Sequence, residues 1–346
     1  MSEPYYKFEQ RRVCTLPQWI PVLLVVIDTE EEFDWSQPFG RNNASVKSMA
    51  KVDVAQQIFN EYNISPIYAI DYPIASQQDG FGPLVSIVKS GHCQIGTHVH
   101  PWVNPPHTEK VNAVNSYIGN LPRPLVEEKM RTLRSTIEEN LGVRPVVFKA
   151  GCYGLSRDIL EIMVEQGYEV DCSTAPGFDF RSDGGPNFLD SCIDCFWCGP
   201  EEKILGIPTT GALTGLWQWK ASATHQFCTT GWRKDLHLLS ILSRLNVHDQ
   251  IRLSPEGYTW QEHRKLTRFL LTRGVRTFTF SFHSPSLAPG NTAYVRTESD
   301  LQTFLDTFRC YFDYFFGELG GRTMTAFELK KELAKQHAHQ RSQVHN

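Results

Sequence analysis

The chain lacks an apolar run long enough to cross a membrane. The longest apolar stretch near its start, WIPVLLVVI at residues 19–27, has nine residues, whereas a membrane-spanning helix needs about 20. Arg11, Arg12 and the segment TLPQ precede this stretch in place of a compact positive region, and no small-residue cleavage site follows it. The pattern is therefore not typical of a signal peptide. We expect a buried strand here, no membrane span and a cytoplasmic protein.

Blocks of positive charge and flexible linkers are also absent. The 34 basic and 38 acidic residues give a net charge of −4. The sequence contains no stripe of basic and aromatic residues of the kind that follows a phosphate backbone, so we expect no nucleic-acid partner. No Gly/Ser-rich or Pro-rich linker divides the 346 residues. We expect an N-terminal extension at 1–19, one domain at 20–322, and a C-terminal helix with a frayed polar tail at 323–346, whose histidines (His337, His339 and His345) are solvated and bind no metal.

Cysteine is present in an odd number, nine, in a chain too large to need disulfides. Without a secretion signal we expect reduced thiols. Cys192, Cys195 and Cys198 lie three apart, a spacing that could hold a metal or an iron–sulfur cluster. No second cysteine pair supplies a fourth ligand, and the intervening Phe196 and Trp197 indicate packing. We therefore predict that these cysteines are structural.

Apolar runs alternate with amphipathic patterns along most of the chain. The clearest unit is RPVVFKAGCYGLSRDILEIMVEQGYEVDCS: a strand, a glycine turn, a helix capped by Ser156 and ended by Gly167, and a second strand. Such a βαβ unit requires a partly parallel sheet and an α/β fold. We expect strands at 21–28, 65–70, 93–97, 145–149, 168–172, 204–208 and 276–282, and helices at about 45–61, 124–140, 156–166, 233–245, 259–273 and 298–318.

Polar residues follow several of these apolar runs directly. In parallel α/β folds the carboxyl ends of the strands carry the functional site, because the loops there converge. Five runs end in residues that can bind a metal or transfer a proton, namely Asp28, His98 with His100, Lys149, Asp171 and His283. The sequence therefore predicts one site built from these strand ends.

Two pairs of residues at these strand ends have the same spacing. Asp28 and Glu30 are separated by one residue, as are His98 and His100, so in extended backbone each pair points to one side. Two imidazoles and a carboxylate suit a divalent metal with an open coordination position. The alternative is that both histidines are satisfied by local hydrogen bonds in a Pro-rich turn.

The remaining acidic and aromatic residues near these motifs are open to two interpretations. The acidic residues Glu31, Glu32 and Asp34 fit a solvated turn somewhat better than a role toward substrate. Trp35 and Trp102 could stack on sugar rings or belong to the core.

The ordered set DTEEEFDW, GTHVHPW, FKAGCYGLS, VDCSTAP and FSFHSPSLAPGNTAYVR resembles the motifs of the NodB-type polysaccharide deacetylase superfamily (carbohydrate esterase family 4). Its WalW-like branch of long members without a signal peptide is the most similar. The likeness runs from about residue 20 to 320. It implies a distorted (β/α) barrel of about seven parallel strands and metal-dependent hydrolysis of an N-acetyl group on an amino sugar.

The resemblance also implies residue roles. Asp28 matches the general base and Glu30 a metal ligand. The family's second histidine ligand stands four residues after the first, but position 102 is Trp102, so His100 takes that role beside His98. The family's arginine that holds the base is replaced by Lys149, which keeps the charge and loses the bidentate fork. The fourth and fifth motifs supply a carboxylate, matched by Asp171, that tunes the histidine acting as acid, matched by His283.

Our leading hypothesis is thus a metal-dependent carbohydrate N-deacetylase that uses zinc, with cobalt or nickel as alternatives. Its substrate would be a carbohydrate or another acetylated small molecule. An amidohydrolase acting on a small cyclic amide, similar to allantoinase, is a second hypothesis. A catalytically weak glycan-binding protein is a third. The sequence leaves the oligomeric state open.

Overall fold

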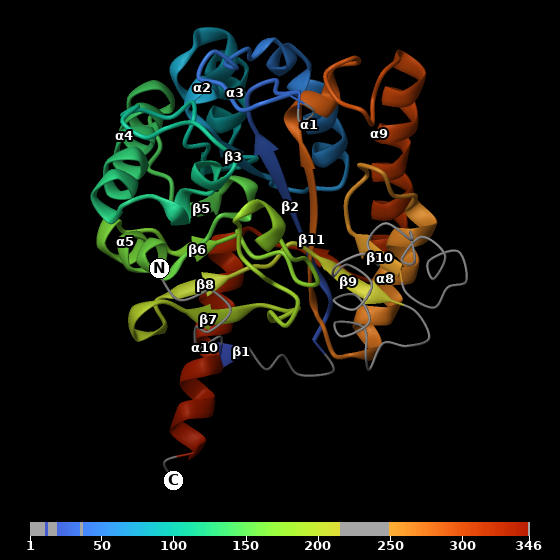
Figure 1. Ribbon diagram of the computed structural model, residues 1–346. Coiled ribbons are helices and arrows are strands. Elements are labelled where there is room, and N and C mark those ends of the chain that lie inside the picture. Colours follow the sequence, from blue (N-terminus) through green and yellow to red (C-terminus); the bar gives the residue numbers. More distant parts are fainter. Residues whose placement is uncertain (1–10, 13–18, 35–36, 215–248, 345–346) are drawn as a thin grey trace, which may run out of the picture.

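The computed structural model describes residues 11–12, 19–34, 37–214 and 249–344, and Figure 1 shows their arrangement. A curled sheet forms the centre. Seven of its strands run parallel in the order β8-β6-β5-β4-β3-β2-β11, which confirms the expected α/β class and the distorted barrel of about seven parallel strands. These strands are β2 (Val22–Thr29), β3 (Ile67–Ile70), β4 (Gln94–Val99), β5 (Val147–Ala150), β6 (Val170–Asp171), β8 (Ile204–Gly206) and β11 (Thr277–His283).

Strand β2 is buried on both faces over its whole length. Alternate side chains of a strand point to opposite faces, so VLLVVI supplies two cores at once. Val22, Leu24 and Val26 belong to an inner core inside the curl, whereas Leu23, Val25 and Ile27 belong to a larger outer core under the helices. This explains why the run is continuously apolar and not alternating, as is typical of parallel sheets.

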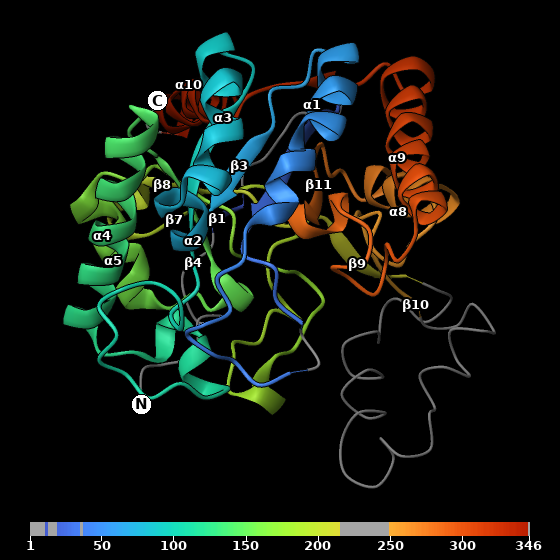
Figure 2. The same ribbon diagram turned by 90° about the horizontal axis from the view of Figure 1, so that it is seen from above.

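Helices cover the outer face of the sheet (Figure 2). They begin and end at the expected signals. The Ser156 hydroxyl accepts from the Ile159 N–H at the start of α5, and Gly167 ends that helix in the left-handed conformation. The helix expected at 233–245 lies outside the described residues. The others are α1 (Val52–Glu61), preceded by a 3-10 turn (Lys47–Lys51), α2 (Tyr72–Ser76), α3 (Gln78–Ser90), α4 (Arg123–Leu141), α5 (Arg157–Gln166), α8 (Trp260–Thr272) and α9 (Glu298–Phe312), which continues as a π-helix (Asp313–Glu318).

The parallel strands do not close into a complete barrel. On the β8 side the sheet continues through antiparallel β7 (Phe196–Cys198) to β1 (Arg11–Arg12), so the N-terminal extension adds an edge strand. Between the two sides lies a small antiparallel sheet of β9 (Gly211–Thr214) and β10 (Asp249–Arg252). Just after β10, the Leu253 N–H donates to the Thr210 carbonyl (2.8 Å), and the Ser281 N–H of β11 donates to the Leu253 carbonyl (3.1 Å). The small sheet is thereby joined to β11 by the backbone.

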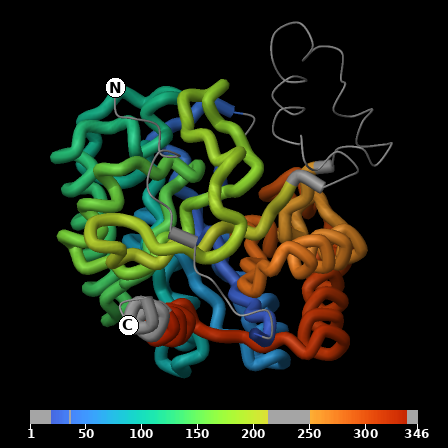
Figure 3. Tube along the Cα trace, turned by 90° about the horizontal axis from the view of Figure 1, so that it is seen from below, coloured from blue at the N-terminus to red at the C-terminus, as the bar shows by residue number. Residues whose placement is uncertain are grey.

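The C-terminal segment closes the opposite end of the curl. Strand β12 (Arg322–Thr323) pairs with the start of β2, and α10 (Ala326–Val344) places Ala326, Leu329 and Leu333 in the inner core. Figure 3 shows the chain crossing below the sheet from α9 to α10. The polar segment that we expected to be frayed is helical as far as Val344, which fits its content of strong helix formers. None of the described helices combines the length and the apolar character needed to cross a membrane.

The three clustered cysteines are divided between the two cores. Cys195 lies in the inner core, Cys198 in the outer core, and half-buried Cys192 packs against the outer core. Burial raises the pKa of the Cys195 and Cys198 thiols well above its usual value, which disfavours the thiolate needed for metal binding. This arrangement supports the prediction that these cysteines are structural.

One buried histidine of the outer layer makes stability depend on pH. His263 of α8 is fully buried between Phe280 and Tyr311, and its Nε2 donates to the Ser254 carbonyl (2.8 Å). Burial lowers its pKa from 6.5 to about 4, against an opposing effect of that hydrogen bond. The unfolded chain therefore takes up a proton before the folded protein does, and stability is lost as the pH falls from 6.5 toward 4.

We predict that replacing His263 with Phe removes this part of the pH dependence. In the wild type, His263 should account for a loss of about 2 kcal/mol in the free energy of unfolding between pH 6.5 and pH 5. Urea titrations of both proteins at several pH values measure the difference. The exposed His92, replaced by Phe, is the control. An equal pH dependence in wild type and His263→Phe would contradict the assignment.

Candidate active site

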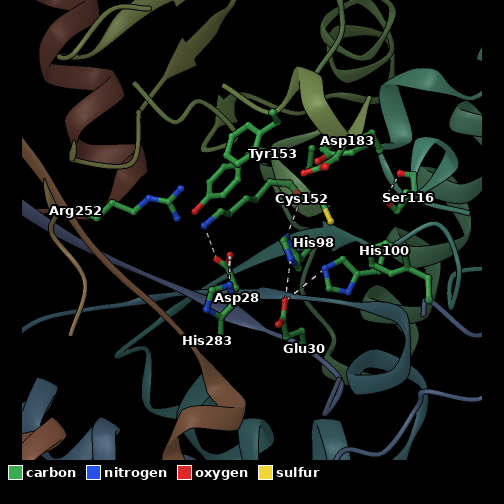
Figure 4. A pocket seen from close by; sticks show the side chains of 16 residues that line it. Asp28, Glu30, His98, His100, Ser116, Cys152, Tyr153, Asp183, Arg252 and His283 are labelled. Carbon is green, nitrogen blue, oxygen red and sulfur yellow. Dashed lines mark hydrogen bonds and ion pairs between the residues drawn. The ribbon is translucent and has the colours of Figure 1, made fainter. Parts of the chain in front are cut away.

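A cavity of about 360 Å³ opens at the carboxyl ends of the parallel strands. The parallel register explains why distant residues meet there: His283 of β11 is level with Asp28 of β2, and His98 of β4 is level with Lys149 of β5. Figure 4 shows the side chains of Asp28, His98 and His283 converging. The structure thus brings together six of the seven predicted site residues, Asp28, Glu30, His98, His100, Lys149 and His283.

Asp28 lies between two cationic side chains. The Lys149 Nζ is 2.5 Å from Asp28 Oδ1, and the His283 Nε2 is 3.6 Å from Asp28 Oδ2. Burial alone would raise the pKa of Asp28, but the charges of Lys149 and His283 together with the Lys149 hydrogen bond lower it to about 2. Burial likewise opposes the charged form of Lys149, yet Asp28 raises the pKa of that ammonium to about 12. Asp28 is therefore a carboxylate at neutral pH, held by a permanently charged partner.

Glu30, His98 and His100 form a buried three-residue cluster whose donor atoms lie within 4.8 Å of one another. The Nε2 atoms of His98 and His100 are 3.3 Å and 3.4 Å from Glu30 Oε2. The Nδ1 of His98 faces the Lys149 carbonyl (3.2 Å), and the Nδ1 of His100 faces a Glu31 carboxylate oxygen (2.8 Å).

These outer contacts fix the tautomers. A carbonyl and a carboxylate only accept hydrogen bonds, so each Nδ1 must carry the proton, and in the neutral ring each Nε2 then presents a lone pair. Burial lowers the pKa of His98 well below its usual value, which keeps that ring neutral. Two lone pairs and a carboxylate oxygen thus face one another, and Glu30 Oε2 accepts no hydrogen bond within the described residues. A divalent cation fits such a donor set.

The interpretation of Glu31 as part of a solvated turn is wrong. Its side chain is completely buried and accepts hydrogen bonds from His100 Nδ1 and Trp102 Nε1 (3.0 Å). Its backbone N–H donates to Asp71 Oδ2 (2.8 Å), a buried carboxylate that sequence reasoning missed. Asp71 follows the apolar strand β3 and caps α2 through the Ile74 N–H. A signal was present, because Asp71 is one more acidic residue directly after an apolar run.

The other residues of the acidic segment differ in their surroundings. Glu32 is half-buried and accepts from the Ser45 hydroxyl (2.6 Å) and the Ser48 N–H (2.5 Å), whereas Asp34 is exposed. Trp102 is buried and stacks on His100 with ring centroids 4.3 Å apart, so it belongs to the core that holds His100 in place. Trp35 lies outside the described residues.

A buried lysine fixes the loop that follows the two histidines. Lys129 of α4 is completely buried, and its Nζ donates to the carbonyls of Pro101 (2.9 Å), Asn104 (2.6 Å) and Pro106 (2.8 Å). Its charge is balanced by Glu109 at 3.2 Å. One ammonium group thereby satisfies three carbonyls that the proline-rich segment cannot pair in a regular element. Lys129 is thus a positioning residue for the chain after His100.

The turn after β5 packs closely against the histidines. A Cβ atom on Gly151 would lie 2.4 Å from Cδ2 of His100 and 2.5 Å from the carbonyl oxygen of Val99, so only glycine fits. The next two residues, Cys152 and Tyr153, have left-handed backbones with φ of 52° and 58°. This conformation costs non-glycine residues about 1–3 kcal/mol each and is concentrated at functional sites.

Asp171 is the seventh predicted residue, and it does not join the others. Its Oδ1 accepts from the N–H and hydroxyl of Ser173 (3.1 Å and 2.5 Å). In the register Asp171 is level with Phe148, a residue of the outer core, whereas the next residue of β5, Lys149, faces the cavity. Alternation along a strand therefore turns Asp171 away from the cavity. Burial raises its pKa to about 7.

The carboxylate beside His283 is Glu256. Its Oε2 lies 2.7 Å from His283 Nδ1, and its Oε1 accepts from the His283 N–H (3.1 Å) and the Ser286 hydroxyl (2.6 Å). Burial lowers the pKa of His283, but the charges of Glu256, Glu30 and Asp28 outweigh this effect and raise it well above its usual value. The expected pairing of Asp171 with His283 is therefore corrected: Glu256, in the segment after β10, takes that position.

Comparison with known proteins agrees with this architecture. No known protein family and no curated protein matches the chain by sequence. Among solved structures, a protein assigned as a polysaccharide deacetylase from Mycobacterium smegmatis superposes with a TM-score of 0.53 at 12% identity and covers 94% of this chain and 95% of its own.

Two other solved structures are less similar. The GH57 branching enzyme of Thermococcus kodakaraensis has a TM-score of 0.49 at 10% identity over 90% of this chain and 71% of its own. The peptidoglycan deacetylase PdaC of Bacillus subtilis has a TM-score of 0.37 at 13% identity over 96% and 99%. The superposition on the Mycobacterium smegmatis protein shows that the chain shares the fold of that polysaccharide deacetylase structure.

The buried pair of Asp28 and Lys149 leads to a stability prediction. Replacing Lys149 with Met should lower the free energy of unfolding by about 3–5 kcal/mol, because it leaves a buried carboxylate without its partner. The double variant Asp28→Asn/Lys149→Met should recover much of this loss, because no buried charge remains unpaired. Urea titration at neutral pH measures both effects.

The matched control is Lys330, which pairs with Glu169 at 2.9 Å on the partly exposed surface. Lys330→Met should cost less than about 1 kcal/mol. If Lys149→Met were no more destabilising than this control, or if the double variant were the least stable protein, the pair would not be the buried charge partnership described above.

Proposed function

We propose that the protein is a metal-dependent hydrolase that removes an N-acetyl group from an amino sugar. The observation that carries the proposal is the buried cluster of Glu30, His98 and His100 beside the Asp28 carboxylate and the His283 imidazole, all lining one cavity. A metal-ligand set, a charged base and a cationic acid within one pocket are the groups needed to hydrolyse an amide.

Glu30 Oε2, His98 Nε2 and His100 Nε2 would hold the metal, for which we propose zinc, with cobalt or nickel able to bind the same donors. When bound, a divalent ion supplies Lewis acidity toward the acetyl carbonyl and toward water. Neighbouring groups hold the two imidazole rings in position. Glu31 and Trp102 fix the His100 ring, and the Lys149 carbonyl fixes the His98 ring. Such support orients ligands and increases their affinity.

Asp28 acts as the general base in this proposal. It is ionised at neutral pH and takes the proton of the attacking water while Lys149 holds it in position. A lysine ammonium contacts a carboxylate at one point, whereas the guanidinium of an arginine can contact it at two. The hydrogen bond of 2.5 Å between Lys149 and Asp28 supports the same task for this lysine.

His283 acts as the general acid. Glu256 holds its Nδ1, so that Nε2 carries the transferable proton on the side of Asp28. An amine is a poor leaving group until it is protonated, and a histidine whose pKa is raised remains cationic at neutral pH. A backbone N–H of the strained turn at Gly151–Tyr153, which borders the cavity, can donate to the oxygen that gains negative charge.

His98→Ala tests the metal site and the reaction together. We expect the variant to lose both bound zinc and deacetylation of N-acetylglucosamine oligomers, because an open three-ligand site cannot lose one ligand and keep its ion. Elemental analysis of the purified protein and release of acetate are the measurements. The exposed His92, replaced by Ala, should keep both properties.

The other hypotheses give different results in the same assay. A zinc-loaded wild type that opens hydantoin-like rings and leaves acetylated sugars intact would point to a cyclic-amide hydrolase. Sugar binding with neither metal nor turnover would point to a glycan-binding protein. Full zinc occupancy in His98→Ala would refute the proposed ligand set.

The general acid is tested by two conservative variants. Glu256→Gln should lower the pKa of His283, because it removes the nearest negative charge, and so should move the alkaline limb of the kcat/KM–pH profile downward by about one pH unit or more. Asp171→Asn should leave that limb in place. The reverse outcome, with the shift found in Asp171→Asn, would restore the sequence-based assignment and contradict the geometry.

A further inference from the structure

The cavity also contains a cation that the proposed reaction does not use. Arg252, the last residue of β10, lines the same cavity as Asp28 and His283, and in Figure 4 its side chain extends toward Tyr153. The lining also includes the aromatic residues Phe39, Tyr117, Tyr153 and Phe180.

Aromatic rings hold the Arg252 guanidinium in place. Its central carbon lies 3.5 Å from the ring centroid of Phe178 and 5.4 Å from that of Tyr153. Arginine stacks on ring faces in this way without using its hydrogen-bond donors. Phe178 in turn stacks with Phe180, at a centroid distance of 6.2 Å. The guanidinium is therefore pre-organised and keeps its donors available.

No carboxylate of the described chain neutralises this charge. Arg252 forms no ion pair within 4 Å there, and its buried Nε donates no hydrogen bond. The other permanent cation of the lining, Lys149, is engaged by Asp28. Asp183 also lines the cavity but is not paired with Arg252. Inside a pocket that also holds an acetamide-cleaving centre, a fixed and uncompensated guanidinium is a recognition site for an anion.

We propose that Arg252 determines specificity by binding an anionic group, a phosphate or a carboxylate, on the sugar whose acetamide is cleaved. This inference rests on the proposed function for the identity of the reaction, while the anion preference follows from Arg252 itself. The planar fork of arginine matches the oxygen atoms of both groups. The cavity of about 360 Å³ is at the small end of ligand pockets, roughly 300–1,000 Å³, which suits a single charged sugar unit.

Binding of sugars that cannot be hydrolysed tests the preference separately from catalysis. The probes are glucose, glucose 1-phosphate, glucose 6-phosphate and glucuronate, with inorganic phosphate as a further probe, measured by calorimetry on the zinc-loaded protein. We expect at least one anionic sugar to bind about tenfold or more tightly than glucose, because one additional charged contact is enough for such a difference in affinity. The phosphate and carboxylate probes distinguish the two kinds of anion.

Arg252→Met should abolish this preference, and Arg252→Lys should retain part of it, because the charge remains while the fork is lost. The matched control is Arg296→Met, since Arg296 is an exposed cation in the neighbouring cavity, which shares Glu30 and His283. Melting temperatures of all variants verify that they are folded. Equal binding of glucose and the anionic sugars by the wild type would overturn the inference, as would a preference that survives in Arg252→Met.

Turnover separates failure of this inference from failure of the proposed function. Suppose that wild type and Arg252→Met both deacetylate N-acetylglucosamine and its 1-phosphate, and that neither protein has a higher kcat/KM for one substrate than for the other. The reaction then stands and the anion site is refuted. If neither is deacetylated but the binding preference for anionic sugars depends on Arg252, the anion site stands and the deacetylase proposal fails.

Discussion

The site depends on one ion pair that spans the inside of the curled sheet. Asp28 of β2 and Lys149 of β5 belong to strands separated by β3 and β4, yet their charged atoms are 2.5 Å apart. This approach requires a strongly curved sheet and small side chains between the partners. The register supplies them, because Ala69 and Gly96 stand level with Asp28 on the two intervening strands. Buried charges must be paired. The curvature of the sheet brings Asp28 and Lys149 together, and their attraction in turn stabilises the curved sheet.

The fold was largely predictable from sequence, because the signals that define it are local. The apolar runs, the Ser156 cap and the Gly167 stop each act within a few residues, and they gave the parallel strands and their helices. Residues at strand ends were predicted to meet because every carboxyl end of a parallel sheet lies on one edge. For six of the seven residues the structure agrees on this convergence.

Asp171 marks where this reasoning stops. The strand end alone does not tell to which face a side chain points, since a shift of one residue reverses the face. Asp28, His98 and Lys149 lie at positions whose side chains point to the cavity face of the sheet, and Asp171 lies at a position that points to the other face. Glu256 could not be assigned either, because it lies in the turn after β10, and its contact with His283 depends on how the small sheet joins β11. That junction is tertiary and leaves no periodic pattern in the sequence.

The residues of the site come from two parts of the fold, and these parts differ in how strongly the parallel strands constrain them. Asp28, His98 and Lys149 come from the main sheet, where each side chain is fixed by its register and by buried neighbours. Glu256 and Arg252 come from the small sheet and its following turn, which is joined to the main sheet through β11. Changes in this second part leave the register of the parallel strands intact. Substitutions in this second part can therefore change the surroundings of His283 and the side chain at position 252, while Asp28, His98 and Lys149 stay in place.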